Sequence, residues 1–179
     1  MEGPADHELM ARVARGDQGA FRLLSQRHAG AALGLARTIV GNDAVAEELV
    51  QEAFLRVWLN APRWRPDAAF RTWLYRIVIN LCLNEKRRAS PLPLDAAGDP
   101  ADPAPGAETE LAERERDRLV AAAVAALPAR QRAAIVLTYT QGLNNAEAAE
   151  MLDTSVSGIE TLLVRAKRAL RAALGSELS

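Results

Sequence analysis

Apolar side chains recur every three or four residues along most of this 179-residue chain, which is the spacing of amphipathic α-helices. The pattern predicts four N-terminal helices, over residues 6–15, 17–40, 44–58 and 68–88. Each has a candidate N-terminal cap before or at its start: Asp6, Asp17, Asn42 or Asp43, and Asp67. A second group of helices is predicted over residues 114–126, 129–140, 144–152 and 155–171. No segment alternates with the period of a β-strand, so we expect an all-α fold.

The helical period is lost between these two groups, in residues 89–113. This segment holds five of the nine prolines of the chain and carries six acidic but no basic residues. Segments of this composition act as extended spacers. The net charge of −1 averages this acidic segment with two mildly basic ones, since residues 1–88 carry 13 basic and 10 acidic side chains and residues 114–179 carry nine and seven. We therefore expect two small helical domains, over residues 1–88 and 114–179, joined by a flexible linker.

The last two predicted helices have the pattern of a helix-turn-helix. Asn144 and Glu147 form a capping box before a short helix, and Asp153 begins a tight turn into a longer one. The alanine pair Ala148 and Ala149 permits the close helix crossing of this motif. The longer helix ends in a basic group: Arg165, Lys167, Arg168 and Arg171. Such a pair of helices is typical of proteins that bind duplex DNA in the major groove.

The loop before the fourth predicted helix combines an aromatic ring with two cations. Trp64 lies between Arg63 and Arg65, and Pro62 and Pro66 bound the segment. Arginines hold phosphates and aromatic rings stack bases, so this composition indicates binding to a single nucleic-acid strand. On the helix that follows, polar side chains recur every four residues as a stripe: Thr72, Arg76, Asn80 and Asn84. The alternative is an ordinary core helix with a solvated basic end.

Other polar and special residues admit simpler interpretations. Glu48, Gln51 and Glu52 form an acidic face that is either solvated or a docking surface for a basic partner. The single cysteine excludes an internal disulfide, and we expect Cys82 to be a small buried side chain. His7 and His28 have no metal-ligand spacing, and each is expected either on the surface or on a helix face. Glycines at 30 and 34 inside a helix favour close packing against a neighbouring helix.

The composition excludes several classes of protein. Hydrophobic residues make up 49% of the chain and charged residues 25%, as in soluble globular proteins. No apolar run reaches the roughly 18 residues of a membrane span, and the N-terminus lacks a signal-peptide pattern. We therefore expect a cytoplasmic protein without membrane insertion. No phosphate-binding glycine loop or catalytic constellation is found, so neither an enzyme nor a cofactor is expected.

Two blocks of the sequence resemble a known family. Residues 46–58 and 70–77, with Asn80, strongly resemble region two of bacterial sigma factors. Leu127-Pro128, Gln131-Arg132, Gly142-Leu143, Glu147-Ala148-Ala149 and residues 155–167 are similar to region four. A chain with these two regions alone is similar to the extracytoplasmic-function group. The likeness spans nearly the whole chain outside residues 89–113.

The resemblance implies a role in transcription initiation and assigns residues to it. It implies that Glu48, Gln51 and Glu52 bind core RNA polymerase. The residues implied to capture the melted minus-ten element of the promoter are Arg63, Trp64, Arg65, Thr72, Trp73, Arg76, Asn80 and Arg87. Those implied to dock on the duplex minus-thirty-five element are Ser155, Ser157, Glu160, Thr161, Arg165, Lys167 and Arg168. An anti-sigma factor is the implied regulator.

The chain departs from the family at the start of its recognition helix. Members commonly place Lys, Ser and Arg where this chain has Glu160, Thr161 and Leu162. Glu160 either accepts a hydrogen bond from a cytosine amine or faces solvent, and the later basic residues are expected to hold phosphates. Two other functions are compatible with the pattern: a sigma mimic that occupies an anti-sigma factor, and an ordinary helix-turn-helix regulator.

Overall fold

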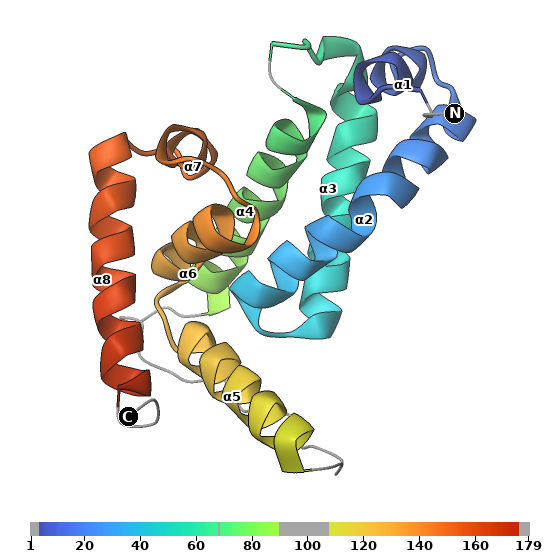
Figure 1. Cartoon of the computed structure of the whole chain (residues 1–179). Coiled ribbons are helices and arrows are strands. Elements are labelled where there is room, and N and C mark those ends of the chain that lie inside the picture. The colour runs from blue at the N-terminus through green and yellow to red at the C-terminus, as the bar shows by residue number, and fades with distance from the viewer. Residues whose placement is uncertain (1–3, 68, 90–107, 176–179) are drawn as a thin grey trace.

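The computed structural model describes residues 4–67, 69–89 and 108–175, and within these ranges it is helical without any β-strand (Figure 1). The N-terminal helices are α1 (Asp6–Val13), α2 (Gln18–Val40), α3 (Asp43–Asn60), the short 3₁₀ helix η1 (Ala61–Arg63) and α4 (Phe70–Ala89). The C-terminal helices are α5 (Glu108–Ala125), α6 (Ala129–Ile135), a π-helical turn η2 (Val136–Thr140), α7 (Asn145–Met151) and α8 (Val156–Leu174). The expected all-α fold is confirmed.

Helix α5 begins at Glu108, six residues before the predicted helix over 114–126. Most of the predicted linker, residues 90–107, lies outside the described residues. The division into a domain of residues 1–88, a linker and a domain of residues 114–179 stays a prediction.

Local hydrogen bonds set the starts of several helices as the sequence predicts. The side chain of Asp17 accepts from the Ala20 amide at 2.9 Å, and that of Asn42 accepts from the Val45 amide at 3.0 Å. Gly41 ends α2 with φ of 71°, a left-handed conformation that glycine adopts without strain. The hydrogen bond from the Ala20 amide, helped by Arg12, lowers the pKa of Asp17.

Two predicted caps are wrong. Ala5 holds the cap position of α1, while the Asp6 carboxylate lies 2.7 Å from His28 Nε2 and also binds a neighbouring arginine of α2. Helix α4 begins at Phe70, and the Trp73 amide donates to the carbonyl oxygen of Ala69 at 3.2 Å. Asp67 therefore lies two residues before the cap position of α4.

The first four helices pack as one bundle around α2, which contacts α1, α3 and α4 (Figure 1). The fully buried side chains include Leu9, Met10, Leu24, Leu35, Ile39, Val57, Leu74 and Val78. Cys82 is buried as expected, and burial raises the pKa of its thiol to about 12.

One expectation about α2 is wrong. A Cβ atom added at Gly30 or Gly34 would meet no atom within 4 Å, so these glycines do not mark a close helix contact. Of the two places expected for His28, the structure has the helix face: the residue is 9% exposed, and its ring centroid lies 5.0 Å from that of Phe70. His7 is exposed as expected.

Helices α6, α7 and α8 form the second bundle, and α5 contacts α8. Ala148 is fully buried and Ala149 nearly so, as the crossing of the two helices requires. The Asn144 side chain accepts from the amides of Ala146 and Glu147, and Glu147 accepts from the Asn144 amide, so the predicted capping box is present. The expected helix-turn-helix is therefore confirmed.

The two bundles touch. Helices α6 and α7 lie against α4, and α6 also contacts the C-terminal end of α2 (Figure 1). Buried side chains of both bundles belong to one continuous apolar cluster.

Candidate nucleic-acid interface

Trp64, in the loop after α3, and Trp73, on α4, line the same hollow. The amide of Trp64 donates to the carbonyl oxygens of Asn60 at 3.1 Å and Ala61 at 3.2 Å, which holds the loop in a tight turn. The Trp64 ring is partly buried, and its centroid lies 6.4 Å from that of Trp73 with the planes inclined by 48°. The hollow measures about 520 Å³ and is lined by Arg56, Asn60, Arg63, Trp64, Arg65, Asp67, Trp73 and Ile77.

Three arginines surround this hollow. Arg63 and Arg65 are exposed, and Arg65 lies 4.0 Å from Asp67, a distance and exposure at which an ion pair contributes little. The Arg56 guanidinium is held on the other side by Glu52 at 2.8 Å. A planar, electron-rich ligand can stack on the tryptophans while the cations hold its phosphates.

The polar stripe of α4 extends from the hollow towards the second bundle. Thr72 is partly buried, whereas Arg76 and Asn80 are exposed. Arg76 Nη2 lies 3.4 Å from Asp153 Oδ1, in the turn between α7 and α8. Asn80 and Arg87 line a groove of about 700 Å³ between the bundles, whose other lining residues are Leu83, Asn84, Lys86, Pro128, Ala129, Arg130, Leu152 and Asp153.

The groove is positively charged. Among the described residues that line it, Lys86, Arg87 and Arg130 are basic, and Asp153, which pairs with Arg76, is the only acidic one. Burial, followed by the charge of Arg132, lowers the pKa of Lys86.

Two exposed leucines, which were not predicted from the sequence, lie beside the acidic residues of α3. Glu48 and Gln51 are exposed, and Glu52 is partly so. Leu55 is 51% exposed and Leu59 65% exposed, and they follow Glu48 by seven and eleven positions, which places them on the same side of the helix. The spacing in the sequence could have revealed these leucines. A leucine seven or eleven positions after an acidic residue lies on the same side of a helix, and a fully solvated face would not carry one.

Helix α8 carries the candidate contacts to duplex DNA. Ser155 accepts from the Gly158 amide at 3.1 Å, and its hydroxyl lies 3.0 Å from that of Ser157. Thr161 donates to the Ser157 carbonyl at 2.9 Å, so the hydroxyls of Ser155 and Thr161 stabilise the first turns of the helix. Glu160 is exposed and has no ion pair within the described part of the chain.

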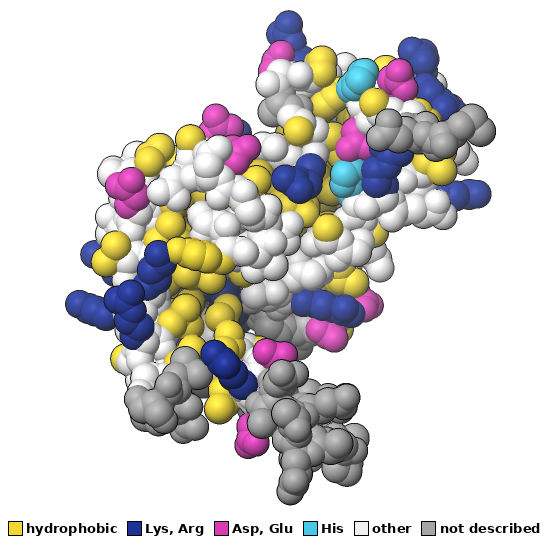
Figure 2. Space-filling model, in the orientation of Figure 1, with side chains coloured by type: hydrophobic (Ala, Val, Ile, Leu, Met, Phe, Trp, Pro, Cys, Tyr) yellow, Lys and Arg dark blue, Asp and Glu magenta, His cyan; other side chains and the backbone are white. Residues whose placement is uncertain are grey.

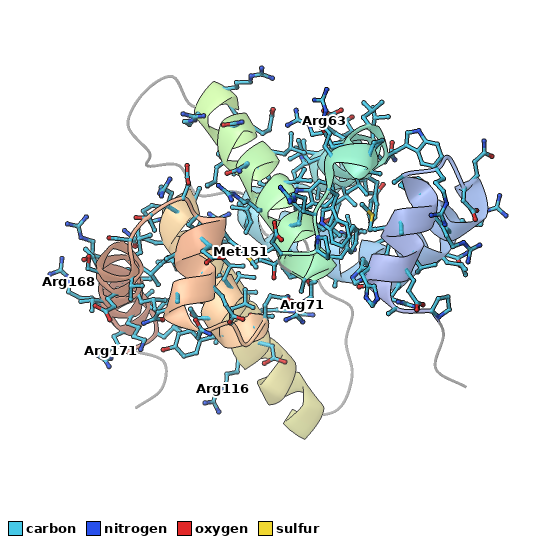
Figure 3. All side chains as sticks on the ribbon, turned by 90° about the horizontal axis from the view of Figure 1, so that it is seen from above. Arg63, Arg71, Arg116, Met151, Arg168 and Arg171 are labelled. Atoms are coloured by element: carbon cyan, nitrogen blue, oxygen red, sulfur yellow. The ribbon has the colours of Figure 1, made fainter. Side chains whose placement is uncertain are left out.

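The basic residues of α8 project outward. Lys and Arg side chains gather over its C-terminal half in Figure 2, and Figure 3 shows Arg168 and Arg171 pointing away from the molecule. Arg165 is also exposed. The Lys167 ammonium instead lies 5.1 Å from the ring centroid of Tyr139, an exposed side chain that the sequence analysis missed.

Neither a metal site nor a membrane-spanning helix is found among the residues that the structure describes. No group of three or more His, Cys, Asp or Glu side chains lies close enough to hold a metal ion. No helix in these ranges is long and apolar enough to cross a membrane.

The sequence matches two models of known families. Residues 24–91 match Sigma-70 region 2, and residues 117–170 match Sigma-70 region 4. The chain is 35% identical to the ECF RNA polymerase sigma factor SigM of Mycobacterium tuberculosis, over 96% of this chain and 85% of SigM. It is 33% identical to the RNA polymerase sigma factor CnrH of Cupriavidus metallidurans, over 97% of this chain and 96% of CnrH.

Two solved structures resemble most of the chain. CnrH in complex with the cytosolic domain of CnrY superposes with a TM-score of 0.70 at 30% identity, over 97% of this chain and 99% of CnrH. The sigma factor RpoE in complex with the anti-sigma factor NepR, from Bartonella quintana, has a TM-score of 0.68 at 20% identity, over 88% of this chain and 98% of RpoE. This second likeness concerns the fold alone.

Proposed function

This chain belongs to the extracytoplasmic-function group of sigma-70 factors, and from that membership we propose how its residues divide the work of transcription initiation. It binds core RNA polymerase and directs promoter recognition. Residues 1–88 bind polymerase and the minus-ten element, residues 114–179 bind the minus-thirty-five element, and residues 89–113 link them. The main support for this assignment is the hollow that Trp64 and Trp73 line together with three arginines.

The hollow receives an unpaired base of the minus-ten element. Extruding a base from a duplex costs a few kcal/mol, and stacking on an aromatic side chain returns about 1–3 kcal/mol per base. Arg63 and Arg65 neutralise the phosphates on either side of that base. Thr72, Arg76, Asn80 and Arg87 continue the path of the same strand along α4. The protein therefore stabilises the melted state by binding and needs no catalytic residue of its own.

The face of α3 docks on core polymerase. Leu55 and Leu59 supply an apolar centre, with Glu48, Gln51 and Glu52 at its polar rim. Interfaces of this kind combine a desolvated apolar patch with charges that select the partner. The partner surface is expected to be basic with exposed apolar residues.

Helix α8 enters the major groove at the minus-thirty-five element. Arg165 and Arg168 hold phosphates, and the exposed Glu160 accepts a hydrogen bond from a cytosine amine. Ser155 caps this helix through the Gly158 amide, and Thr161 donates to the Ser157 carbonyl, so these bonds hold the first turns that Ser155 and Ser157 present to DNA. Lys167 is held by Tyr139 and reaches phosphates from the side of the helix.

The location of the protein in the cell is inferred from that of its partner, core RNA polymerase. Core RNA polymerase works in the cytoplasm, and we place this protein there. Because the related CnrH was solved in complex with the cytosolic domain of CnrY, we propose that a regulatory protein, an anti-sigma factor, also binds this chain.

Run-off transcription with purified core polymerase tests the proposal. The template is a library of duplexes with randomised minus-ten and minus-thirty-five elements, so no promoter sequence is assumed. The expected result is transcription that depends on this protein and enriches defined elements. A sigma mimic yields no transcript, and an ordinary helix-turn-helix regulator yields none unless another sigma factor is added.

A further inference from the structure

Val164 is the most exposed large hydrophobic side chain among the residues that the structure describes, at 67%. It lies in the middle of α8, the helix assigned above to the major groove. Ile159, Leu163 and Ala166 of the same helix are buried and hold it against the rest of the second bundle. Val164 does not belong to that buried face, so packing within the described part of the chain does not account for it.

Helix propensity does not account for this valine either. A β-branched side chain loses rotamer freedom in a helix, and an exposed one gains nothing from burial in return. The exposed positions that follow on α8 hold residue types of higher helix propensity: Arg165, Lys167, Arg168, Ala169, Arg171, Ala172 and Ala173. Single exposed hydrophobic residues are common on protein surfaces, so the place of Val164 on the helix has to decide whether it has a function.

Val164 lies on the outward side of α8 together with the candidate contacts to DNA. It follows Thr161 by three positions and Glu160 by four, and it precedes Arg168 by four. Residues at these spacings are neighbours on one side of a helix. All four side chains are exposed, and Arg168 points away from the molecule (Figure 3). An apolar side chain is therefore flanked by polar ones on the surface that faces the bases when α8 enters the major groove.

Glu160 and Thr161, one turn before Val164, present acceptors to a base rather than donors. Glu160 is a carboxylate, and Thr161 donates its one hydroxyl hydrogen to the Ser157 carbonyl at 2.9 Å. Leu162 is partly buried and packs against the core. Guanine O6 and N7 need donors, whereas the adenine amine is itself a donor. A T·A pair therefore offers both groups that this surface can bind, the adenine amine and the apolar thymine methyl group.

Resting on the proposed function, we propose that Val164 reads a thymine of the minus-thirty-five element by apolar contact with its 5-methyl group. Among the four bases of unmodified DNA, thymine alone carries an apolar group in the major groove, so this contact discriminates it from cytosine at the same position. Arg165 and Arg168 hold the phosphates nearby. The unusual residues at the start of this recognition helix then change which bases the helix reads, and base readout itself is kept.

Replacing thymine by deoxyuridine tests this contact, because it removes the 5-methyl group and leaves the hydrogen-bonding groups of the base pair unchanged. The duplex carries the promoter selected by the transcription library, with each thymine of the minus-thirty-five element replaced in turn on either strand. Holoenzyme is assembled from core polymerase and the full chain, and its affinity for each duplex is measured at low temperature, where the closed complex forms.

Val164→Ala is the test variant, since alanine shortens the side chain to Cβ and has a higher helix propensity than valine, so the fold is kept. Val120→Ala is the matched control, because it removes the same atoms from an exposed position of α5. The wild type and the control are expected to bind about fourfold more weakly when one particular thymine is replaced, the effect of losing one buried methyl group. Val164→Ala is expected to bind the thymine duplex more weakly by a similar factor, and to respond less than about twofold to deoxyuridine at that position.

Equal sensitivity of Val164→Ala and the control to deoxyuridine at every position overturns the proposal, and so does a selected minus-thirty-five element without thymine on either strand. Run-off transcription by the wild type reports the proposed function separately. Absence of any transcript contradicts the proposed function and the role of Val164 with it, whereas transcription with equal sensitivity contradicts the role of Val164 alone.

Discussion

Among single residues, polar side chains that are buried without a counter-ion have the largest effect on the stability of the fold. Arg132 is the clearest case: burial lowers its pKa, and its guanidinium is bound to backbone carbonyls rather than to a carboxylate of any residue that the structure describes. Such a group stabilises the fold only while each of its partners is in place.

Arg132→Met is expected to lower the free energy of unfolding by about 1–3 kcal/mol, because it leaves buried carbonyl oxygens unpaired. Arg130→Met is the matched control, since Arg130 is exposed and makes one hydrogen bond, to the Leu152 carbonyl at 2.8 Å. Urea unfolding followed by circular dichroism measures both variants. Equal stability of the two variants contradicts this contribution of Arg132.

At the scale of elements, short helices depend on their caps. Helix α7 has seven residues, too few to be stable alone, and Asn144 and Glu147 satisfy the free amides at its start. This helix positions the turn before α8, so its cap supports the DNA-binding motif.

Asn144→Ala is expected to destabilise the protein by about 1 kcal/mol, the usual effect of losing an N-terminal cap. Asn145→Ala, one residue later, removes the same side chain from a position without a capping bond and is expected to change stability by less than about 0.5 kcal/mol. Thermal unfolding of the two variants is compared under identical conditions. A larger loss for Asn145→Ala contradicts the role of the capping box.

The exposed face of α3 is tested at the same scale. Reversal of two rim charges, Glu48→Lys with Glu52→Lys, is expected to abolish binding to core polymerase while helical content stays unchanged. Exposed charges contribute less than about 1 kcal/mol each, so both are changed together. Glu115→Lys with Asp117→Lys on α5 is the control for net charge. Undiminished pull-down of core polymerase by the first variant excludes this face as the docking surface.

At the scale of the whole molecule, promoter melting requires the assembled holoenzyme. Trp64→Ala with Arg65→Ala is expected to leave polymerase binding and the closed complex intact but to weaken the open complex, by about 1–3 kcal/mol for the lost stack. Permanganate reactivity of unpaired thymines measures opening on a linear duplex and on a template mismatched across the minus-ten element.

The mismatched template is expected to restore part of the transcription of this variant, because the duplex is already open. Normal opening of the duplex by the variant means that Trp64 serves core packing alone. Failure of the mismatched template to restore any transcription means that the loop serves a step other than melting.

Elements that depend on local interactions can be predicted from the sequence of this chain. Asp17, Asn42, Asn144 and Ser155 cap helices through hydrogen bonds to amides two or three residues away, and such bonds need no information from the rest of the chain. The all-α class and the helix-turn-helix follow from the same periodicity and caps. The family likeness was also visible in the two motif blocks.

The partners of other groups are distant in sequence, and the packing of the helices is needed to identify them. Asp6 binds His28, 22 positions away, so a residue predicted as a cap pairs instead with a side chain of another helix. Arg76 meets Asp153 across 77 positions and Arg132 meets Ile39 across 93. Periodicity shows which face of a helix is polar, but it does not show whether solvent, DNA or another domain covers that face, because this depends on how the helices pack.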